Sequence, residues 1–205
     1  MGEGFVTRGF RGKRPPEDVR RRLPPGQYLE QDFPVLTAGP TPRLGTERWD
    51  LRLVDPAGRV LSRWTWEEFR ALPRQEFTCD IHCVTQWSKL DTSWSGVSLD
   101  VLLEGVDVAA TPWLVAACEG GYTTNLPLAE VLGGRAWVVD TYGGEPLAPE
   151  HGGPARMLVP ALYLWKSAKW LRGLRLRRED APGFWERRGY HNHGDPWKEE
   201  RFWRS

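Results

Sequence analysis

Residues 77–88 read Phe-Thr-Cys-Asp-Ile-His-Cys-Val-Thr-Gln-Trp-Ser, and the first seven of them alternate between apolar and polar side chains. This period of two predicts a β-strand with one apolar face, whose members are Phe77, Cys79, Ile81 and Cys83. Cys83 lies at or just past the end of the strand, where a loop is expected. A reactive, exposed thiolate is better placed there than at Cys79, which lies within the strand.

The same segment allows a second interpretation, a zinc site in which Cys118 joins Cys79 and Cys83. In a strand, however, Cys79 and Cys83 would lie about 13 Å apart, too far for two thiolates to bind one metal ion. Only a helix or a tight turn would bring the two sulfurs together. The strand prediction therefore disfavours zinc.

A cysteine–histidine hydrolase is a third interpretation, in which Cys83 pairs with a distant imidazole, that of His151, His191 or His193. The surrounding sequence gives this no support, because it has no Gly-rich nucleophile turn and no residue that would orient the imidazole. A phosphate-binding loop with its lysine, a dinucleotide fingerprint and a two-histidine metal helix are also missing from the sequence.

Outward from this strand, short strands alternate with short helices. Thr65 and Glu68 form a capping box before a helix that Pro73 stops, and Ser98 caps a second helix. Strands are predicted at 49–54, 60–61, 77–83, 113–118, 136–142, 157–159 and 170–176, and helices at 66–72, 99–103 and 126–132. Gly and Pro make up 39 of the 205 residues, which keeps the helices short. The pattern predicts one mixed α+β domain.

The composition narrows the classes of function. Lys and Arg total 28 against 27 Asp and Glu, which argues against a protein that binds nucleic acid through a general basic surface. No apolar run reaches the roughly 18 residues that a membrane-spanning helix needs, and the first 25 residues contain no apolar signal-peptide core. Three cysteines in such a chain do not form a disulfide framework. We expect a cytoplasmic protein.

The two ends differ from the middle in composition. Residues 1–26 contain seven Lys or Arg against three acids, with four prolines, which predicts a basic, Pro-rich N-terminal arm. Residues 178–205 are charged, aromatic and irregular, which predicts a C-terminal extension packed on the domain. The domain itself is expected over residues 27–177.

A second cluster of chemically useful groups lies between residues 151 and 169. Arg156 offers a planar fork for a phosphate and Lys166 and Lys169 offer point charges, whereas Ser167 and Ala168 are small enough for their backbone N–H groups to approach an anion. The cluster is typical of an anion-binding loop, and equally of a solvated loop with scattered charges.

Several motifs together, in order along the chain, resemble the molybdopterin-binding oxidoreductase family, which includes sulfite oxidase and the catalytic subunit of the periplasmic methionine sulfoxide reductase system. The motifs span residues 80–88, 94–97, 119–128, 144–147, 151–156, 159–160 and 165–170. The resemblance covers roughly residues 28–177. It implies a sulfite-oxidase-like molybdopterin-binding domain with mixed β-sheets and short helices.

The resemblance also implies roles for individual residues. Cys83 matches the family's molybdenum ligand, and a soft thiolate suits a metal that passes an oxygen atom between oxidation states. The residues that match cofactor-binding positions are His82, Cys83, Cys118, His151, Arg156, Ser167, Ala168 and Lys169, the last three in the phosphate loop. The implied cofactor is molybdopterin carrying molybdenum, with tungsten as a possible replacement.

Departures from the family pattern bear on the substrate. Sulfite oxidases carry arginines shortly after the ligand cysteine, whereas Val84-Thr85-Gln86-Trp87 follows Cys83 here, so sulfite is not the expected substrate. The Asn and Tyr that hold the pterin near the start of the sulfoxide-reductase branch have no clear match in residues 27–48.

These features together predict an oxidoreductase that performs oxygen-atom transfer or two-electron redox chemistry on a small substrate. It would exchange electrons with a separate protein, because the sequence has no iron–sulfur or haem motif of its own. A non-catalytic molybdopterin carrier or sensor is the alternative. Candidates for the pocket wall are Trp87, Trp94 and Tyr122, and candidates to cover the pocket or donate protons are Tyr190, His191 and His193.

Overall fold

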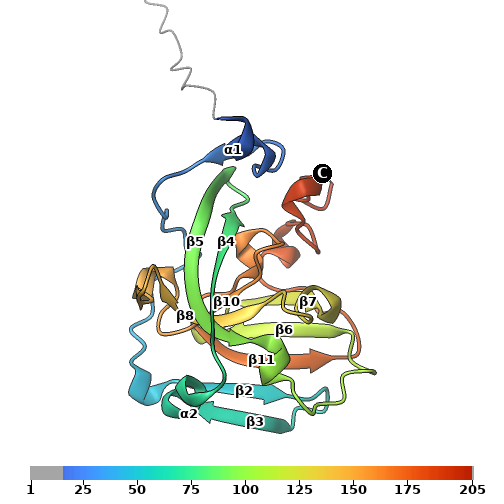
Figure 1. The fold of residues 1–205 in the computed structure, drawn as a ribbon. Coiled ribbons are helices and arrows are strands. Elements are labelled where there is room, and N and C mark those ends of the chain that lie inside the picture. The colour runs from blue at the N-terminus through green and yellow to red at the C-terminus, as the bar shows by residue number, and fades with distance from the viewer. Residues whose placement is uncertain (1–15, 205) are drawn as a thin grey trace, which may run out of the picture.

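The computed structural model describes residues 16–204, and in them two β-sheets form the framework (Figure 1). The strands are β1 (Tyr28–Leu29), β2 (Asp50–Val54), β3 (Val60–Thr65), β4 (Gln75–His82), β5 (Trp87–Ser98), β6 (Trp113–Cys118), β7 (Thr123–Pro127), β8 (Trp137–Tyr142), β9 (Glu145–Pro146), β10 (Arg156–Leu158) and β11 (Leu171–Arg177). The five-stranded sheet has the order β3-β2-β11-β6-β7. The six-stranded sheet has the order β1-β5-β8-β10, with β4 beside β5 and β9 beside β8.

Helices are few and short. The α-helices are α1 (Glu17–Arg21), α2 (Trp66–Ala71) and α3 (Leu99–Leu102), and the 3₁₀ turns are η1 (Thr46–Arg48), η2 (Glu119–Gly121), η3 (Leu128–Glu130), η4 (Pro149–His151), η5 (Leu164–Lys166), η6 (Glu186–Arg188) and η7 (Pro196–Lys198). The capping box before α2 is confirmed, because the Thr65 side chain accepts from the Glu68 N–H and the Glu68 carboxylate accepts from the Thr65 N–H. The α+β class with mixed sheets and short helices is likewise confirmed.

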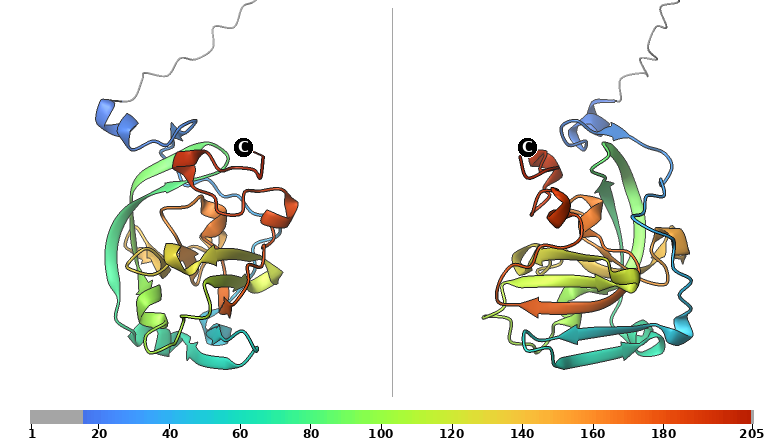
Figure 2. Two further views of the ribbon diagram at one scale, coloured as in Figure 1. Left: turned by 90° about the vertical axis from the view of Figure 1, so that its right-hand side faces the viewer. Right: turned by 180° about the vertical axis from the view of Figure 1, so that it is seen from behind.

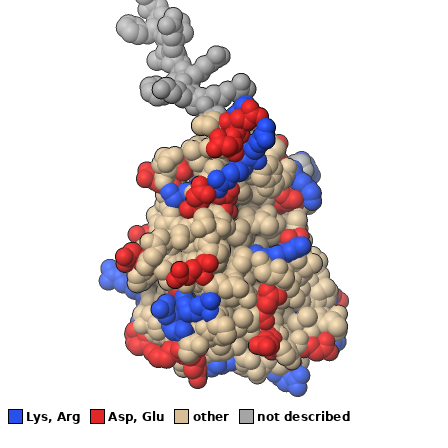
Figure 3. Space-filling model, in the orientation of Figure 1, with Lys and Arg blue, Asp and Glu red and all other residues tan. Residues whose placement is uncertain are grey.

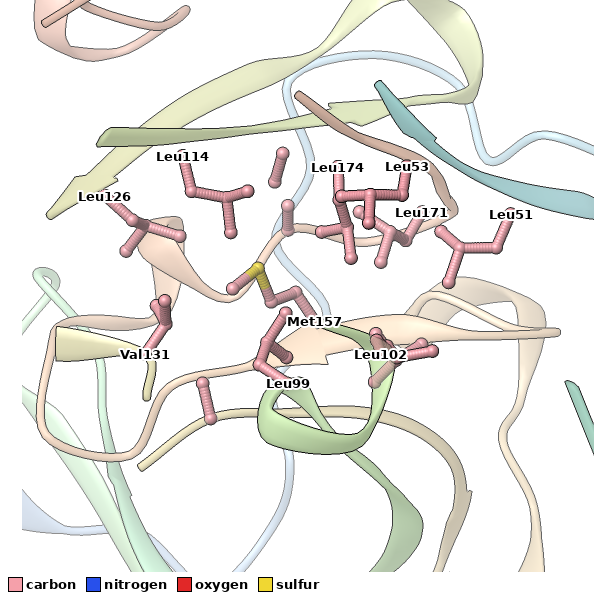
Figure 4. Close-up of a cluster of buried hydrophobic side chains, with 14 of the residues drawn as sticks. Leu51, Leu53, Leu99, Leu102, Leu114, Leu126, Val131, Met157, Leu171 and Leu174 are labelled. Atoms are coloured by element: carbon pink, nitrogen blue, oxygen red, sulfur yellow. The ribbon is translucent and has the colours of Figure 1, made fainter. Parts of the chain in front are cut away.

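The main core lies between the five-stranded sheet and the layer formed by β8, β10 and α3 (Figure 4). Alternate residues of β2, β6 and β11 point into it, among them Leu53, Leu114 and Leu174, all fully buried. Met157 of β10 meets them from the opposite layer. A second cluster, built around Trp87 and Trp94, supports the long strand β5. The two clusters hold the strands in place on either side, including the end of β4 that precedes Cys83.

The predicted helix over residues 126–132 is wrong. Leu126 and Pro127 end strand β7, where they pair with Leu114 and Trp113 of β6, and only η3 follows. Because β7 is an edge strand, a proline there forfeits no ladder hydrogen bond. Strand β5 has no counterpart among the predicted elements, because its sequence mixes serines, tryptophans and one glycine without a steady alternation.

The N- and C-terminal segments meet at the turn between β4 and β5 (Figures 1 and 2). Arg22, just after α1, binds both Asp80 and Asp91 of this hairpin through its guanidinium group. From the other end of the chain, Arg201 donates to the carbonyl oxygens of Val84 and Pro25. Part of the predicted N-terminal arm, residues 1–15, lies outside the described residues.

Candidate active site

A cavity of about 680 Å³ opens where several segments of the chain meet. Its walls come from residues 33–42, the turn after β4, η2, Arg156 of β10, η5 with the loop that follows it, and the C-terminal segment. The lining residues most important for its chemistry are Cys83, Thr85, Arg156, Ser167, Ala168 and Lys169. A volume of this size is typical of sites for small molecules and cofactors.

Cys83 enters the cavity from a tight turn. The Cys83 N–H donates to the carbonyl oxygen of Trp87 at 2.8 Å, and the Gln86 N–H donates to that of Cys83 at 3.1 Å. The turn closes because Gln86 adopts a left-handed φ of 75°. The sequence places Cys83 at the strand end, and the structure presents its sulfur to the cavity although only 6% of the residue is exposed to solvent.

The turn after β4 places polar groups beside the sulfur of Cys83. The Thr85 hydroxyl lies 3.1 Å from the sulfur, and the backbone N–H groups of Val84 and Thr85 are near enough to lower the pKa of the thiol. Burial raises the pKa of the Cys83 thiol, and these donors oppose the rise. The pKa stays raised on balance, so the thiol is the favoured form of the free side chain, and a soft metal that displaced its proton would bind the thiolate.

Arg156 supplies a buried positive charge to the cavity, and no acid among residues 16–204 pairs with it. Only 2% of this residue is exposed, and its guanidinium group donates to the carbonyl oxygens of His151, Ser167 and Met157 at 2.8, 2.6 and 3.3 Å. Burial lowers the pKa of Arg156 to about 10. Backbone carbonyls orient a guanidinium group but leave its charge unbalanced, so an anion in the cavity would complete it.

The loop after η5 brings three further predicted residues to the cavity. The Ser167 hydroxyl accepts from the Val159 N–H at 2.9 Å, and the Ala168 carbonyl accepts from the Met157 N–H at 2.9 Å. Lys169 donates to the carbonyl oxygens of Leu36 and Glu150. Burial, and then the neighbouring Arg156, lower the pKa of Lys169 to about 8. Like Arg156, Lys169 has no carboxylate partner among the described residues.

His151 stands at the edge of this group. Its ring stacks on Phe33, with centroids 4.1 Å apart and planes 8° apart, and its buried Nδ1 has no hydrogen-bond partner among the described residues. Burial lowers the pKa of His151, which keeps the ring neutral and able to accept or donate one hydrogen bond. His151 itself does not line the cavity, but its ring packs on Phe33 and its carbonyl oxygen accepts from Arg156, and both of those residues do.

Three of the predicted cofactor residues do not line the cavity: His151, which stacks behind the lining residue Phe33, and also His82 and Cys118. The His82 Nδ1 bonds to the Ser88 hydroxyl at 2.8 Å, and burial lowers the pKa of His82 to about 4. Cys118 ends β6 and lines a different groove, and burial raises the pKa of its thiol to about 12. The zinc interpretation gains no support either, since residues 16–204 hold no group of three metal-ligating side chains.

The residues predicted to form the wall or the cover of the pocket also fall into two groups, those that line the cavity and those that do not. Trp87, Tyr122 and Tyr190 line the cavity, whereas Trp94 is buried in the second hydrophobic cluster. His191 and His193 face carboxylates instead, those of Glu200 and, for His193, also Glu130.

Sequence reasoning missed two walls of the cavity. Residues 33–42 run as an extended chain along one side, and Trp165, Phe184 and Trp185 close another. Prolines 34, 40 and 42 signal an extended chain, but without periodicity nothing in the sequence indicates which surface that chain covers.

Comparison with known proteins identifies the class. A family model described as the oxidoreductase molybdopterin binding domain matches residues 38–185, and the chain therefore belongs to this family of molybdopterin-binding oxidoreductases. It is 42% identical over 193 residues to YuiH of Bacillus subtilis, an uncharacterized oxidoreductase, covering 93% of this chain and 97% of YuiH.

More distant relatives are longer proteins. The chain is 29% identical to YedZ1 of Azospira oryzae, named as a protein-methionine-sulfoxide reductase subunit, over 62% of this chain and 48% of that protein. It is 26% identical to human mitochondrial sulfite oxidase over 74% of this chain and 33% of the enzyme. The sulfane dehydrogenase SoxCD of Paracoccus pantotrophus shares the fold, with a TM-score of 0.61 at 20% identity over 92% of this chain and 58% of that chain.

Proposed function

We propose that this chain is a molybdenum-cofactor-dependent oxidoreductase that transfers an oxygen atom, or two electrons with their protons, to or from a small substrate other than sulfite. The observation that carries the proposal is that the cavity holds a cysteine sulfur and a buried positive charge that the protein itself does not neutralise. Cys83 lines the cavity with the Thr85 hydroxyl 3.1 Å from its sulfur, and Arg156 presents a buried charge with no acid partner between residues 16 and 204. A molybdenum ion with an anionic pterin phosphate would complete both.

In this proposal Cys83 holds the metal, and the guanidinium group of Arg156 holds the phosphate together with Ser167, Ala168 and Lys169. The unpartnered Nδ1 of His151 is available to the pterin. When bound, molybdenum supplies the oxygen-atom or two-electron chemistry, and tungsten is the alternative metal. The roles of His82, Cys118 and His151 in cofactor binding stay predictions, because none of the three lines the cavity.

Apolar groups dominate the remaining walls, which argues for a neutral substrate. The lining includes the aromatic side chains of Trp87, Trp165, Trp185 and Tyr190, and Arg156 is the only arginine among the described residues that line the cavity. A sulfite dianion would need additional cations to repay its desolvation. A neutral sulfoxide or N-oxide needs only an apolar surface and a few hydrogen bonds.

The first test is elemental analysis of protein made in a host that synthesises the cofactor. We expect near-stoichiometric molybdenum in the native chain and its loss from Cys83→Ser, whereas Cys79→Ser, which alters a cysteine outside the cavity, keeps the metal. Equal molybdenum content and turnover in native and Cys83→Ser protein would remove Cys83 as the ligand. Zinc in place of molybdenum would remove the proposal.

Turnover separates an enzyme from the alternative, a carrier or sensor. Loaded protein is assayed with sulfoxides and N-oxides against a reduced dye, and with sulfite against an oxidised dye. We expect turnover in the first assay and little in the second. A fully loaded protein that turns over nothing would favour the carrier.

Electrons would pass to or from a separate protein, also as part of this proposal. The described residues contain no helix long and apolar enough to cross a lipid bilayer. In the view of Figure 3 basic and acidic side chains are interspersed over the surface. The absence of nucleic-acid binding and a cytoplasmic location stay predictions from the sequence.

A further inference from the structure

A second cavity, a groove of about 620 Å³, lies on the five-stranded sheet. Arg52 and Gly173 are register partners on β2 and β11 and alternate with the core residues Leu53 and Leu174, so they lie on the face of the sheet opposite the core. The floor of the groove is formed by residues with small side chains, Gly173 and Ala117. A Cβ at Gly173 would meet only the Ala117 Cβ and the Arg52 carbonyl oxygen, both at 3.7 Å.

Arginines surround this floor, and we call the site the arginine groove; its guanidinium groups belong to Arg52, Arg172, Arg175 and Arg177. Arg52 and Arg172 contact Asp50 at 2.8 and 2.5 Å. Arg175 and Arg177 are exposed and make no ion pair with any residue between 16 and 204.

The acids in the groove do not balance this charge. Asp50 also contacts Arg63 at 2.7 Å, and Asp55 contacts Arg59 at 2.7 Å. Both of those arginines lie outside the lining, so two of the three acids are shared with further cations. The third acid, Glu119, reaches only Arg172, at 3.9 Å. The groove therefore carries a net positive charge that Arg175 and Arg177 present to solvent.

The arginine groove adjoins the cavity of the candidate active site. Glu119 and Gly120 of η2 line both of them. Cys118, in the groove, is close enough to Arg156 for the two groups to influence each other's pKa. A molecule seated in the groove is therefore separated from the cavity by one turn of chain.

We propose that the arginine groove docks an electron-transfer protein through an acidic patch on that partner, an inference that rests on the proposed redox function. The chemistry of the lining favours a protein over a nucleotide, because no aromatic side chain in the groove would stack on a base. Electron-transfer complexes bury little area and depend on charge complementarity for rapid association. Exposed arginines one turn from the cofactor cavity meet both requirements.

The test uses a plant-type [2Fe–2S] ferredoxin as an acidic probe and cytochrome c as a basic one. Each reduced ferredoxin gives up one electron, so two encounters supply the two electrons of one turnover. The double variant Arg175→Glu/Arg177→Glu reverses the groove's charge. The double variant Arg21→Glu/Arg135→Glu makes the same change in net charge at exposed arginines outside the groove.

We expect the rate constant for reduction of loaded enzyme by ferredoxin to fall at least about 10-fold in the groove variant and less than about twofold in the control. The rate for native protein falls as salt rises, and dye-supported turnover stays unchanged in both variants. Equal ferredoxin rates in the groove variant and the control would overturn the proposal. So would tighter binding of cytochrome c than of ferredoxin to native protein.

Binding of oxidised ferredoxin, measured by titration, does not depend on the cofactor. If the chain holds no molybdenum, the proposed function fails, yet a groove-dependent affinity for ferredoxin still supports the docking surface. If ADP binds in the groove and ferredoxin does not, the groove is a nucleotide site and the docking proposal is wrong.

Discussion

Two buried cations, Lys166 and Arg156, lie on neighbouring segments and are satisfied in opposite ways. Lys166 is fully buried, contacts the Glu186 carboxylate at 2.7 Å, and donates to the Asn125 side chain and to the carbonyl oxygens of Asn125 and Asn192. Arg156 is almost as deeply buried and finds only carbonyl oxygens. The first network is electrically complete and the second is not.

The presence or absence of an acid partner indicates which of the two cations has a structural role and which is available to bind a ligand. A buried ion pair is costly to break but closed to ligands, so Lys166 and Glu186 hold the C-terminal segment against η5. A buried charge without an acid is costly in the free protein and is compensated only when an anion arrives. This is why we assign Arg156 to the proposed cofactor site, together with Lys169, which also has no carboxylate partner among the described residues.

The largest effect on the free energy of unfolding is expected at the paired residues Lys166 and Glu186. Glu186→Gln leaves the Lys166 charge buried without its partner and should lower the free energy of unfolding by about 3–5 kcal/mol. Urea unfolding of the cofactor-free chain measures this, with Glu179→Gln on the surface as the control. The double change Glu186→Gln/Lys166→Met should recover part of the loss. A loss below about 1 kcal/mol would mean that the pair is not a structural element.

At Arg156, whose network lacks an acid, a substitution should change the affinity for the cofactor more than the stability of the fold. Arg156→Gln should reduce affinity for the cofactor by about 10- to 100-fold, the value of a charge-assisted hydrogen bond of about 1.5–3 kcal/mol. Unfolding of the cofactor-free chain should change less than in Glu186→Gln. Cofactor content and urea unfolding are measured on the same preparations.

Arg74→Gln is the matched control, because Arg74 already has an acid, Asp140, as its partner. We expect this variant to lose stability and keep its cofactor. If Arg156→Gln instead unfolds the chain and loaded protein retains its cofactor normally, the contrast between the two buried cations fails.

The sequence allowed the local half of this site to be predicted. Cys83 at a strand end and the cluster from Arg156 to Lys169 follow from alternation and from residue chemistry within short stretches. The long-range half could not be predicted. Lys166 belongs to the same cluster as Arg156, yet its partner Glu186 lies in an irregular segment without periodicity. Which of two neighbouring cations is satisfied depends on a contact that no local pattern encodes.

The same reasoning applies to the fold. The hairpin of β2 and β3, the capped helix α2 and strand β6 were predicted because alternation, capping residues and apolar runs are local signals. Pro127 misled because a proline suits the first turn of a helix and the end of an edge strand equally well. Only its pairing with Trp113 decides between the two.

Lys169 allows the comparison to be tested through the pH dependence of the free energy of unfolding. Its pKa is about 8 in the folded chain, below the value near 10.4 of an unfolded lysine, so the unfolded chain binds more protons between those limits. The free energy of unfolding of cofactor-free protein should therefore rise from pH 8 to about pH 10, relative to Lys169→Met. Lys198→Met, at an exposed lysine, should show no such difference.

A bound anion should diminish this pH dependence, because its charge raises the pKa of Lys169 again. Urea unfolding at pH 8, 9 and 10, with and without cofactor, measures both effects. A pH dependence identical in native protein and Lys169→Met would show that Lys169 is solvated and takes no part in the incomplete network.

The smallest expected effect concerns the Thr85 hydroxyl beside the sulfur of Cys83. Reduction of a metal–thiolate unit adds negative charge, which the Thr85 hydroxyl at 3.1 Å stabilises. Thr85→Val should therefore lower the midpoint potential of bound molybdenum. The loss of one such hydrogen bond, about 1 kcal/mol, corresponds to about 40 mV for a one-electron couple.

A redox titration followed by electron paramagnetic resonance measures this potential, and Thr85→Ser, which keeps the hydroxyl, is the matched variant. We expect Thr85→Ser to retain the native potential and both variants to retain molybdenum. An unchanged potential in Thr85→Val would show that the hydroxyl serves only to close the turn after β4. The incomplete network would then be limited to the two cations, Arg156 and Lys169.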